Sequence, residues 1–280
     1  MLFRSTYTTS QIAKNAGVHP NTVRKYEEWG LIQKPLRKPN GYRIFTDIHL
    51  KQIALLRKAF QIEVMQAGLR SRIVNVVKLS AQYRFDEAVQ LAEEYIFIAG
   101  REKQNAREAA EICEELYKAD FQNNANKKKH GANSGGTYKD FGTSESEKTF
   151  LKRSEAARLL NLTIDTIRNW EMNGLLKVKR KKNGYRIYDT NDINRLKIIR
   201  SLRCANYSLS AILRMLNVLE YRMNKSRTDI LEVLNTPDES EDIVSVCDRL
   251  VFSLEKAEEN AREVISLINE IKALAENEKS

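Results

Sequence analysis

Two arginines at matching places in an internal repeat, Arg24 and Arg168, are the side chains best suited to bind a ligand. Each is the third residue of the pattern Thr-[Val/Ile]-Arg-x-[Tyr/Trp]-Glu-x-x-Gly-Leu-[Ile/Leu], which occupies residues 22–32 and again residues 166–176. A guanidinium donates to two acceptors at once, which suits a guanine edge or the oxygens of a phosphate. The repeated chemistry is therefore that of nucleic-acid recognition.

A second block of the repeat, Asn-Gly-Tyr-Arg-Ile-[Phe/Tyr], occupies residues 40–45 and 183–188. The spacing between the two blocks differs by a single residue between the copies, so both copies share one architecture. Asn-Gly between short extended stretches predicts a hairpin with a type I′ turn, whose two central residues both need positive φ. Lysines and arginines crowd both hairpins, and such a basic loop would position DNA by its phosphates more than it would specify a sequence.

The expected contacts with double-stranded DNA lie on the helix that carries each arginine and on the hairpin that follows it. In the first copy they are Asn21, Thr22, Arg24, Lys25, Tyr26, Arg37, Lys38 and Arg43. In the second copy they are Asp165, Thr166, Arg168, Asn169, Trp170, Lys179, Arg180, Lys181 and Arg186. The aromatic residues at these places fit core packing equally well, because buried aromatic side chains dominate small cores.

Further helices must hold these segments in place. Thr8 and Gln11 have the spacing of a capping box that begins a helix, Gly17 ends that helix, and Pro20 suits the first position of the next one. Capping residues and an apolar face predict a third helix after each hairpin, and Ser208 begins a fourth in the second copy. The matching stretch of the first copy, residues 62–79, is patterned less clearly.

Two long helical tracts, residues 86–118 and 241–276, carry small and apolar residues at alternating spacings of three and four. Glu102 interrupts the first seam, whereas the second is unbroken. Helices of this length need a partner helix to bury such a stripe. The polar stretch between the first tract and the second copy predicts a flexible linker over residues 119–149.

The charge of the chain is unevenly distributed. Its formal net charge is +10, but residues 7–57 carry 9 basic and 3 acidic side chains, and residues 150–203 carry 14 and 5. Residues 86–118 carry 4 basic and 9 acidic side chains, and residues 238–280 carry 5 and 12. Basic repeats joined to acidic helices favour nucleic acid over a membrane surface as the partner.

Several classes of protein are excluded by what the sequence lacks. It has no phosphate-binding glycine loop, nucleophile elbow or recognisable carboxylate pair, so we expect no enzymatic activity and no cofactor. The three cysteines are far apart, which favours neither a disulfide framework nor a metal site. With no membrane span and no signal peptide in the sequence, we expect a cytoplasmic protein associated with the nucleoid.

The two repeated blocks and the order of elements around them resemble the winged-helix DNA-binding domain of the MerR family of bacterial transcription regulators. The resemblance covers about residues 7–75 and 150–218, and the long helices resemble the family's dimerisation helix. It implies regulation near a promoter and contact with RNA polymerase. This chain departs from the family pattern in carrying two such domains, in placing Trp170 where tyrosine is usual and His19 at a helix cap, and in having no effector domain after its last helix.

With this resemblance, the expected fold is mainly α, with two winged helix-turn-helix domains, each followed by a long coiled-coil helix. The expected boundaries are 1–80 for the first domain, 81–118 for its long helix, 119–149 for the linker, 150–220 for the second domain and 221–280 for the C-terminal helical region.

Two questions of function stay open at this stage. The two long helices would pair antiparallel within one chain, which makes a covalent pseudo-dimer, or the chain would form a homodimer with four DNA-binding lobes. The protein would regulate genes, or it would anchor or bend DNA as a segregation or recombination accessory factor.

Overall fold

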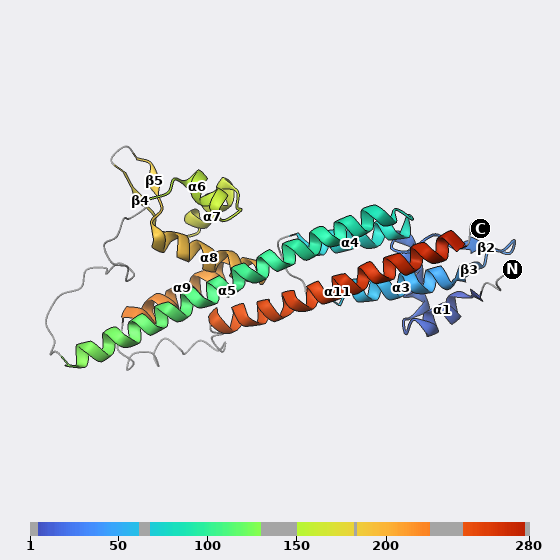
Figure 1. The fold of residues 1–280 in the computed structure, drawn as a ribbon, viewed down its shortest axis with the longest axis horizontal. Helices are drawn as coiled ribbons and strands as arrows, with labels where there is room; N and C mark the ends of the chain where they lie inside the picture. Colours follow the sequence, from blue (N-terminus) through green and yellow to red (C-terminus); the bar gives the residue numbers. More distant parts are fainter. Residues whose placement is uncertain (1–4, 62–67, 130–149, 182–183, 225–242, 278–280) are drawn as a thin grey trace. The chain divides into compact units, whose positions relative to one another are not determined.

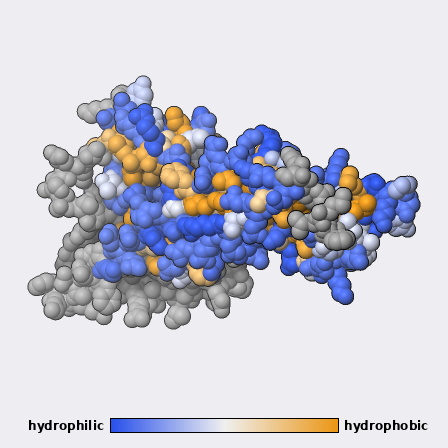
Figure 2. Space-filling view, turned by 45° about the vertical axis from the view of Figure 1, so that its right-hand side comes forward, coloured by the Kyte–Doolittle hydropathy of each residue, from blue (hydrophilic) through white to orange (hydrophobic). Residues whose placement is uncertain are grey.

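The computed structural model describes residues 5–61, 68–129, 150–181, 184–224 and 243–277. They divide into two compact units (Figure 1), of which the first comprises residues 1–101 with 252–280 and the second residues 102–251. In the space-filling view, hydrophilic residues cover most of the described surface, and apolar residues show between them in patches (Figure 2). The chain is mainly helical, as predicted.

The first unit begins with a helix-turn-helix and a small sheet. Its elements are β1 (Thr6–Tyr7), α1 (Thr9–Asn15), α2 (Pro20–Glu28), β2 (Leu36–Arg37), β3 (Arg43–Thr46), α3 (Asp47–Ala59) and α4 (Leu69–Ala81). The predicted capping box begins α1, since the Gln11 N–H donates to Thr8 Oγ1 at 3.3 Å and the Thr8 N–H donates to Gln11 Oε1 at 2.8 Å. Helices α1 and α2 and strand β3 close over a core that contains Ile12, Val23 and Phe45.

The three-stranded sheet has the order β1-β3-β2 and is antiparallel throughout. The turn between β2 and β3 differs from the predicted type I′ turn. The Gly41 N–H donates to the Lys38 carbonyl and the Lys38 N–H donates to the Tyr42 carbonyl, both at 2.8 Å, and only Gly41 of the central residues has a positive φ, of 82°. This geometry is a three-residue loop in which Pro39 takes the first corner of a type I turn and glycine the left-handed position.

The first unit also contains parts of both long helices, α5 (Phe85–Lys129) and α11 (Ile243–Asn277). Lys272 near the end of α11 pairs with Asp86 in the first turn of α5, at 2.8 Å. Lys51 of α3 reaches Glu270 of α11 at 2.5 Å. The seam residues predicted on these parts of the two helices are buried, among them Ala92, Ala99, Leu254, Ala257, Ala261, Val264, Ile268 and Ile271. The alanines among them allow the helices to approach closely.

The second unit repeats the arrangement of the first. Its elements are α6 (Arg153–Leu159), α7 (Ile164–Met172), β4 (Lys179–Arg180), β5 (Arg186–Ile187), α8 (Thr190–Cys204) and α9 (Leu209–Asn224), with the rest of α5 and α11. Ser208 caps α9 as predicted, accepting from the Ala211 N–H at 3.2 Å. The cap of α8 is Asp189, whose Oδ1 accepts from the Asp192 N–H at 3.0 Å.

The interruption of the first seam at Glu102 has a structural cause in the second unit. Glu102 is buried, and its carboxylate pairs with Arg200 of α8 at 2.8 Å. Arg200 also donates to the Leu160 carbonyl at 2.7 Å, at the end of α6. The charged residue on the seam therefore joins three helices of the unit.

The predicted linker begins too early. Helix α5 continues to Lys129, so residues 119–129 are helical, whereas residues 130–149 lie outside the described part of the chain. The weakly patterned stretch of the first copy contains a helix after all, since α4 begins at Leu69 after Gly68, whose φ is 73°. The earlier residues of that stretch, 62–67, are also outside the described part.

Candidate nucleic-acid interface

Helix α2 presents a polar and basic face in the first unit. Val23 is fully buried and Tyr26 packs partly against the same core, which turns Asn21, Arg24 and Lys25 towards solvent. Arg24 donates to Asn21 Oδ1 at 2.6 Å, so its guanidinium is held over the first turn of the helix. The exposed face therefore carries donors of the kind that bind base edges and phosphates.

The start of α2 depends on the histidine that the sequence places at its cap. His19 Nδ1 accepts from the Asn21 N–H at 3.2 Å, and Pro20 follows at the first helical position. His19 thereby replaces the hydroxyl of a usual cap, because a ring nitrogen can accept the same backbone hydrogen bond.

Helix α7 presents the corresponding face in the second unit. Asp165, Arg168 and Asn169 are exposed, whereas Ile167 is fully buried. Thr163 caps the helix by accepting from the Thr166 N–H at 3.0 Å. Thr22 and Thr166, which correspond in the repeat, are both partly buried at the edge of their faces.

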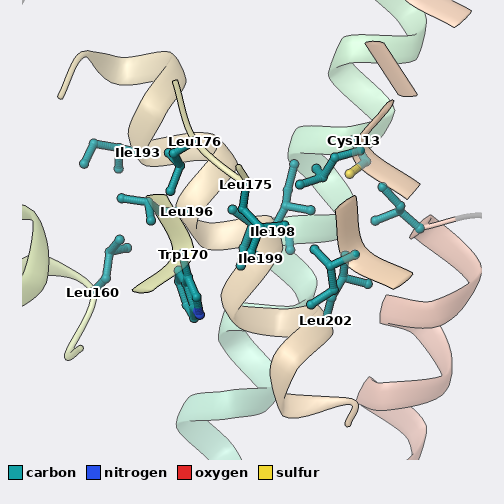
Figure 3. Packing of buried hydrophobic residues seen from close by; sticks show 14 of the residues in the cluster. Cys113, Leu160, Trp170, Leu175, Leu176, Ile193, Leu196, Ile198, Ile199 and Leu202 are labelled. Carbon is teal, nitrogen blue, oxygen red and sulfur yellow. The ribbon is translucent and has the colours of Figure 1, made fainter. Parts of the chain in front are cut away.

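The burial of Trp170 corrects the expectation that this residue contacts DNA directly. Only 4% of its surface is exposed, and its indole lies in the core of the second unit near Leu196 and Ile199 (Figure 3). Ile167 and Trp170 are three residues apart, so both fall on the face of α7 that packs inward. Trp29 has the opposite placement, with 56% of its surface exposed, and the ammonium of Lys25 lies 6.0 Å from its ring centroid.

The hairpin of each unit forms a basic wing. Arg37 and Lys38 are exposed in the first wing, and Lys179, Arg180 and Lys181 are exposed in the second. Lys179 also lies 3.5 Å from Asp189 at the cap of α8. In the second wing the Gly184 N–H donates to the Lys181 carbonyl at 2.8 Å, the bond that closes the first wing.

The other predicted wing residues, Arg43 and Arg186, are half-buried and bind carboxylates of the neighbouring helix. Arg43 Nε lies 2.5 Å from Glu27 of α2, and Arg186 Nε lies 2.6 Å from Glu171 of α7. Glu27 also approaches Arg37 at 3.6 Å. The two arginines therefore fix the wing to the helix, and less of their donor capacity remains for DNA.

Sequence reasoning missed Glu27 and Glu171, although both occupy the same place in the repeated pattern and each has an arginine at the same place in the second block. Glu171 is the more extensively bonded. Arg153 of α6 approaches it at 2.7 Å, and the Tyr188 hydroxyl donates to it. Burial and this hydrogen bond raise the pKa of Tyr188 to about 12, so the hydroxyl keeps its proton.

Two exposed tyrosines on the wings also escaped the prediction. Tyr42 and Tyr185 follow the glycine of each hairpin, with 71% and 70% of their surfaces exposed. A hydroxyl at the tip of a basic loop is suited to donate to a phosphate. Their signal in the sequence was the repeated Asn-Gly-Tyr-Arg itself.

Two negative findings apply to the part of the chain that the structure describes. No described helix is long and apolar enough to cross a membrane. Among the same residues, no group of three or more His, Cys, Asp or Glu side chains is placed to hold a metal ion. Cys113, Cys204 and Cys247 are buried free thiols.

Known families match both repeats. The profile of the MerR HTH family regulatory protein matches residues 151–219, and that of the MerR family regulatory protein matches residues 8–45. A CueR regulator from Vibrio cholerae serotype O1 is 33% identical over 98 residues, which cover 70% of that protein and 32% of this chain. The chain belongs to the MerR family.

Other relatives match over a shorter stretch. The HTH-type transcriptional regulator CueR of Salmonella typhi is 47% identical over 53 residues, or 19% of this chain, and the HTH-type transcriptional regulator MerD of Shigella flexneri is 40% identical over 57 residues, or 20% of this chain. The chain spans 38% of the length of that CueR protein and 48% of MerD. No solved structure matches the chain.

Proposed function

We propose that this MerR-family chain is a transcription regulator that binds double-stranded DNA in a sequence-specific way through two different recognition helices. The observation that carries the proposal is the repeated geometry of the interface. In each unit a polar and basic helix face lies next to a basic wing, and a half-buried glutamate binds the wing arginine to the helix. A helix of this kind fits the major groove while the wing contacts the flanking phosphates.

Within this interface we assign reading of bases to Arg24 and Arg168, with Asn21, Lys25 and Asn169 beside them. These side chains are exposed on the first turns of their helices. The exposed wing residues position the DNA by neutralising phosphates; they are Arg37, Lys38, Lys179, Arg180 and Lys181. Arg43 and Arg186 act through the glutamates as positioning residues.

We further propose that the chain acts as a covalent pseudo-dimer. Two contacts support antiparallel pairing of the long helices within one chain. In the first unit, the first turn of α5 meets the end of α11 through Asp86 and Lys272. In the second unit, Cys113 of α5 and Cys247 near the start of α11 belong to one buried cluster. These contacts support pairing of the two seams within one chain.

Light scattering after gel filtration tests this arrangement. We expect a mass near 32.3 kDa, that of one chain, at micromolar concentration. A stable particle of twice that mass would favour the homodimer with four DNA-binding lobes and would refute the pseudo-dimer.

Because the two faces differ, with Lys25 in place of Asn169 and Asn21 in place of Asp165, the proposed DNA site has two unlike half-sites. Selection of bound duplexes from a random pool tests this. Arg24→Ala is expected to relax the preference at one half-site and Arg168→Ala at the other. Uniform weakening across all sequences would reassign that arginine to phosphates.

Arg214→Ala is the matched control for the selection. It removes the same charge from an exposed position on α9, a helix that belongs to neither face and neither wing. We expect it to leave the selected sequences unchanged.

Regulation itself, including contact with RNA polymerase, is tested by mapping the bound sites across the genome. A few sites centred on promoters support a regulator. Hundreds of dispersed sites would instead favour the rival function of an anchoring or bending protein.

A further inference from the structure

The second unit contains a pocket that the DNA-binding proposal does not use. It has a volume of about 180 Å³ and lies among Leu116 of α5, the segment that follows α7, the first turns of α8 and the middle of α9. An engineered apolar cavity of roughly 150 Å³ is large enough to hold benzene. The pocket in the second unit is therefore large enough for a small organic molecule.

The lining of the pocket combines an apolar wall with polar groups. Ile198, Leu216 and Leu219 are buried and supply the wall. Lys177, Asn191 and Asn194 supply an ammonium and two amides. This combination of an apolar surface with a few convergent polar groups is typical of small-molecule sites.

The charges of the lining favour an anion. Lys177 forms no ion pair with any residue that the structure describes. The carboxylate in the lining, Asp192, accepts from the Asp189 N–H at 3.1 Å and thus serves the cap of α8. The guanidinium of Arg195, which also lines the pocket, donates to the Leu175 carbonyl at 2.5 Å. The pocket thus carries two cations against one carboxylate.

The corresponding place in the first unit carries uncharged side chains. Gln33 stands where the repeat has Lys177, and Gln52 stands where it has Arg195. The Gln33 N–H donates to Gln52 Oε1 at 2.9 Å, and the Tyr83 hydroxyl donates to Gln33 Oε1. Gln52 is 1% exposed. Since both copies share one architecture, the ammonium and the guanidinium that line the pocket are particular to the second copy.

We propose that this pocket binds a small carboxylic acid with a compact apolar body, of about the size of benzoate. The carboxylate is held by the ammonium of Lys177 and by the amides of Asn191 and Asn194, and the apolar body lies against Ile198, Leu216 and Leu219. The occupant contacts the connection between α7 and β4, which contains Gly174 and Lys177.

Calorimetric titration of the full chain with benzoate, in the absence of DNA, tests the proposal. We expect saturable binding at one site per chain. Benzyl alcohol and benzylammonium, which keep the ring but lose or reverse the charge, are expected to bind at least about tenfold more weakly. Equal binding of benzyl alcohol, stronger binding of benzylammonium, or no binding of benzoate would overturn the proposal.

Variants locate the site. Lys177→Met keeps the length of the side chain and removes its charge, so we expect about a tenfold loss of benzoate affinity. Lys78→Met is the matched control, because Lys78 is an exposed lysine of α4 in the first unit, and it should bind benzoate as the unchanged chain does. Equal affinity of both variants would place any binding elsewhere.

A second variant fills the pocket. Asn194→Trp is expected to abolish binding, with far-ultraviolet circular dichroism confirming that the helices are intact. Persistent benzoate binding by this variant would overturn the assignment. No measurement in this series includes DNA, so failure of the proposed regulatory function would leave its outcome unaffected.

Discussion

The ion pair between Glu102 and Arg200 predicts a large loss of stability when one partner is neutralised. Its side chains are 5% and 12% exposed, and the charged atoms are 2.8 Å apart. Glu102→Gln keeps the shape of the side chain but leaves the guanidinium of Arg200 without its counter-charge. Two neutral hydrogen-bond partners remain. The Leu160 carbonyl still accepts from Arg200, and Asn105, which donates to Glu102 at 3.2 Å, can donate to the glutamine that replaces it.

The expected magnitude follows from burial. Removing one partner of a buried ion pair costs about 3–5 kcal/mol. Because Arg200 keeps its bond to a backbone carbonyl, we expect the lower end, about 3 kcal/mol in the free energy of unfolding. With a urea dependence of about 3 kcal/mol per molar, the unfolding midpoint of the second unit falls by about 1 M.

Tryptophan fluorescence measures this unit by itself. The chain contains two tryptophans, Trp29 in the first unit and Trp170 in the core of the second. In a Trp29→Phe background, the remaining indole therefore reports unfolding of the unit that contains the ion pair. Trp29 is largely exposed, so its replacement is expected to change stability little.

Glu108→Gln is the matched control, because Glu108 pairs with Lys197 at 3.3 Å but is 39% exposed. Such a pair contributes about 1 kcal/mol or less. The double variant Glu102→Leu with Arg200→Met should recover most of the lost stability, since no charge is then left buried. If Glu102→Gln lowers the midpoint no more than Glu108→Gln does, the reasoning from burial is refuted.

Two further predictions concern the wing and the pH dependence of stability. Glu171→Gln frees Arg186 from α7, so we expect the ratio of specific to non-specific DNA affinity to fall several-fold in fluorescence anisotropy; an unchanged ratio would contradict the anchoring role. Burial lowers the pKa of His49 to about 4, so the folded chain takes up the proton less readily than the unfolded chain does. The free energy of unfolding therefore falls by up to about 3 kcal/mol from this group as the pH falls from about 6.5 to 4. Burial raises the pKa of Asp192 to about 6, so its charged form destabilises the fold at pH 7, and protonation removes that cost in a pH range that overlaps the titration of His49. The contribution of His49 is therefore measured as the difference in the free energy of unfolding between the unchanged chain and His49→Gln, from urea unfolding at each pH. A difference that does not change with pH would exclude the buried imidazole as the cause.

The sequence predicted helix starts correctly where one capping side chain determines one hydrogen bond. The capping box of Thr8 and Gln11 and the cap at Ser208 are of this kind. The turn type was wrong because Asn-Gly was weighed without the length of the loop around it. In both units the same two backbone hydrogen bonds close a loop of three residues that ends in glycine, and this loop needs a positive φ at the glycine alone.

Contacts between residues distant in the sequence could not be predicted from the sequence. Glu102 was recognisable as a break in a seam, but nothing in the chain indicated that Arg200 would neutralise it. The placement of Trp170 had the same limit, because a helix of nine residues gives too few turns to decide whether its one aromatic side chain faces the core. The glutamates at positions 27 and 171 were visible as repeated residues, and only the geometry showed that they bind the wing.

Comparison of the two copies within one chain shows which residues maintain the shared fold and which differ at the proposed binding surfaces. Arg43 with Glu27, and Arg186 with Glu171, form the same ion pair in both units, as expected for a bond that sets the angle between helix and wing. The exposed faces differ in charge at two matched places, and the pocket beside α8 is lined by Lys177 and Arg195 where the first unit has the half-buried Gln33 and the buried Gln52. A chain that needed only two equal DNA-binding lobes would have no use for these differences. They are the physical basis for proposing unlike half-sites and a ligand that affects one lobe alone.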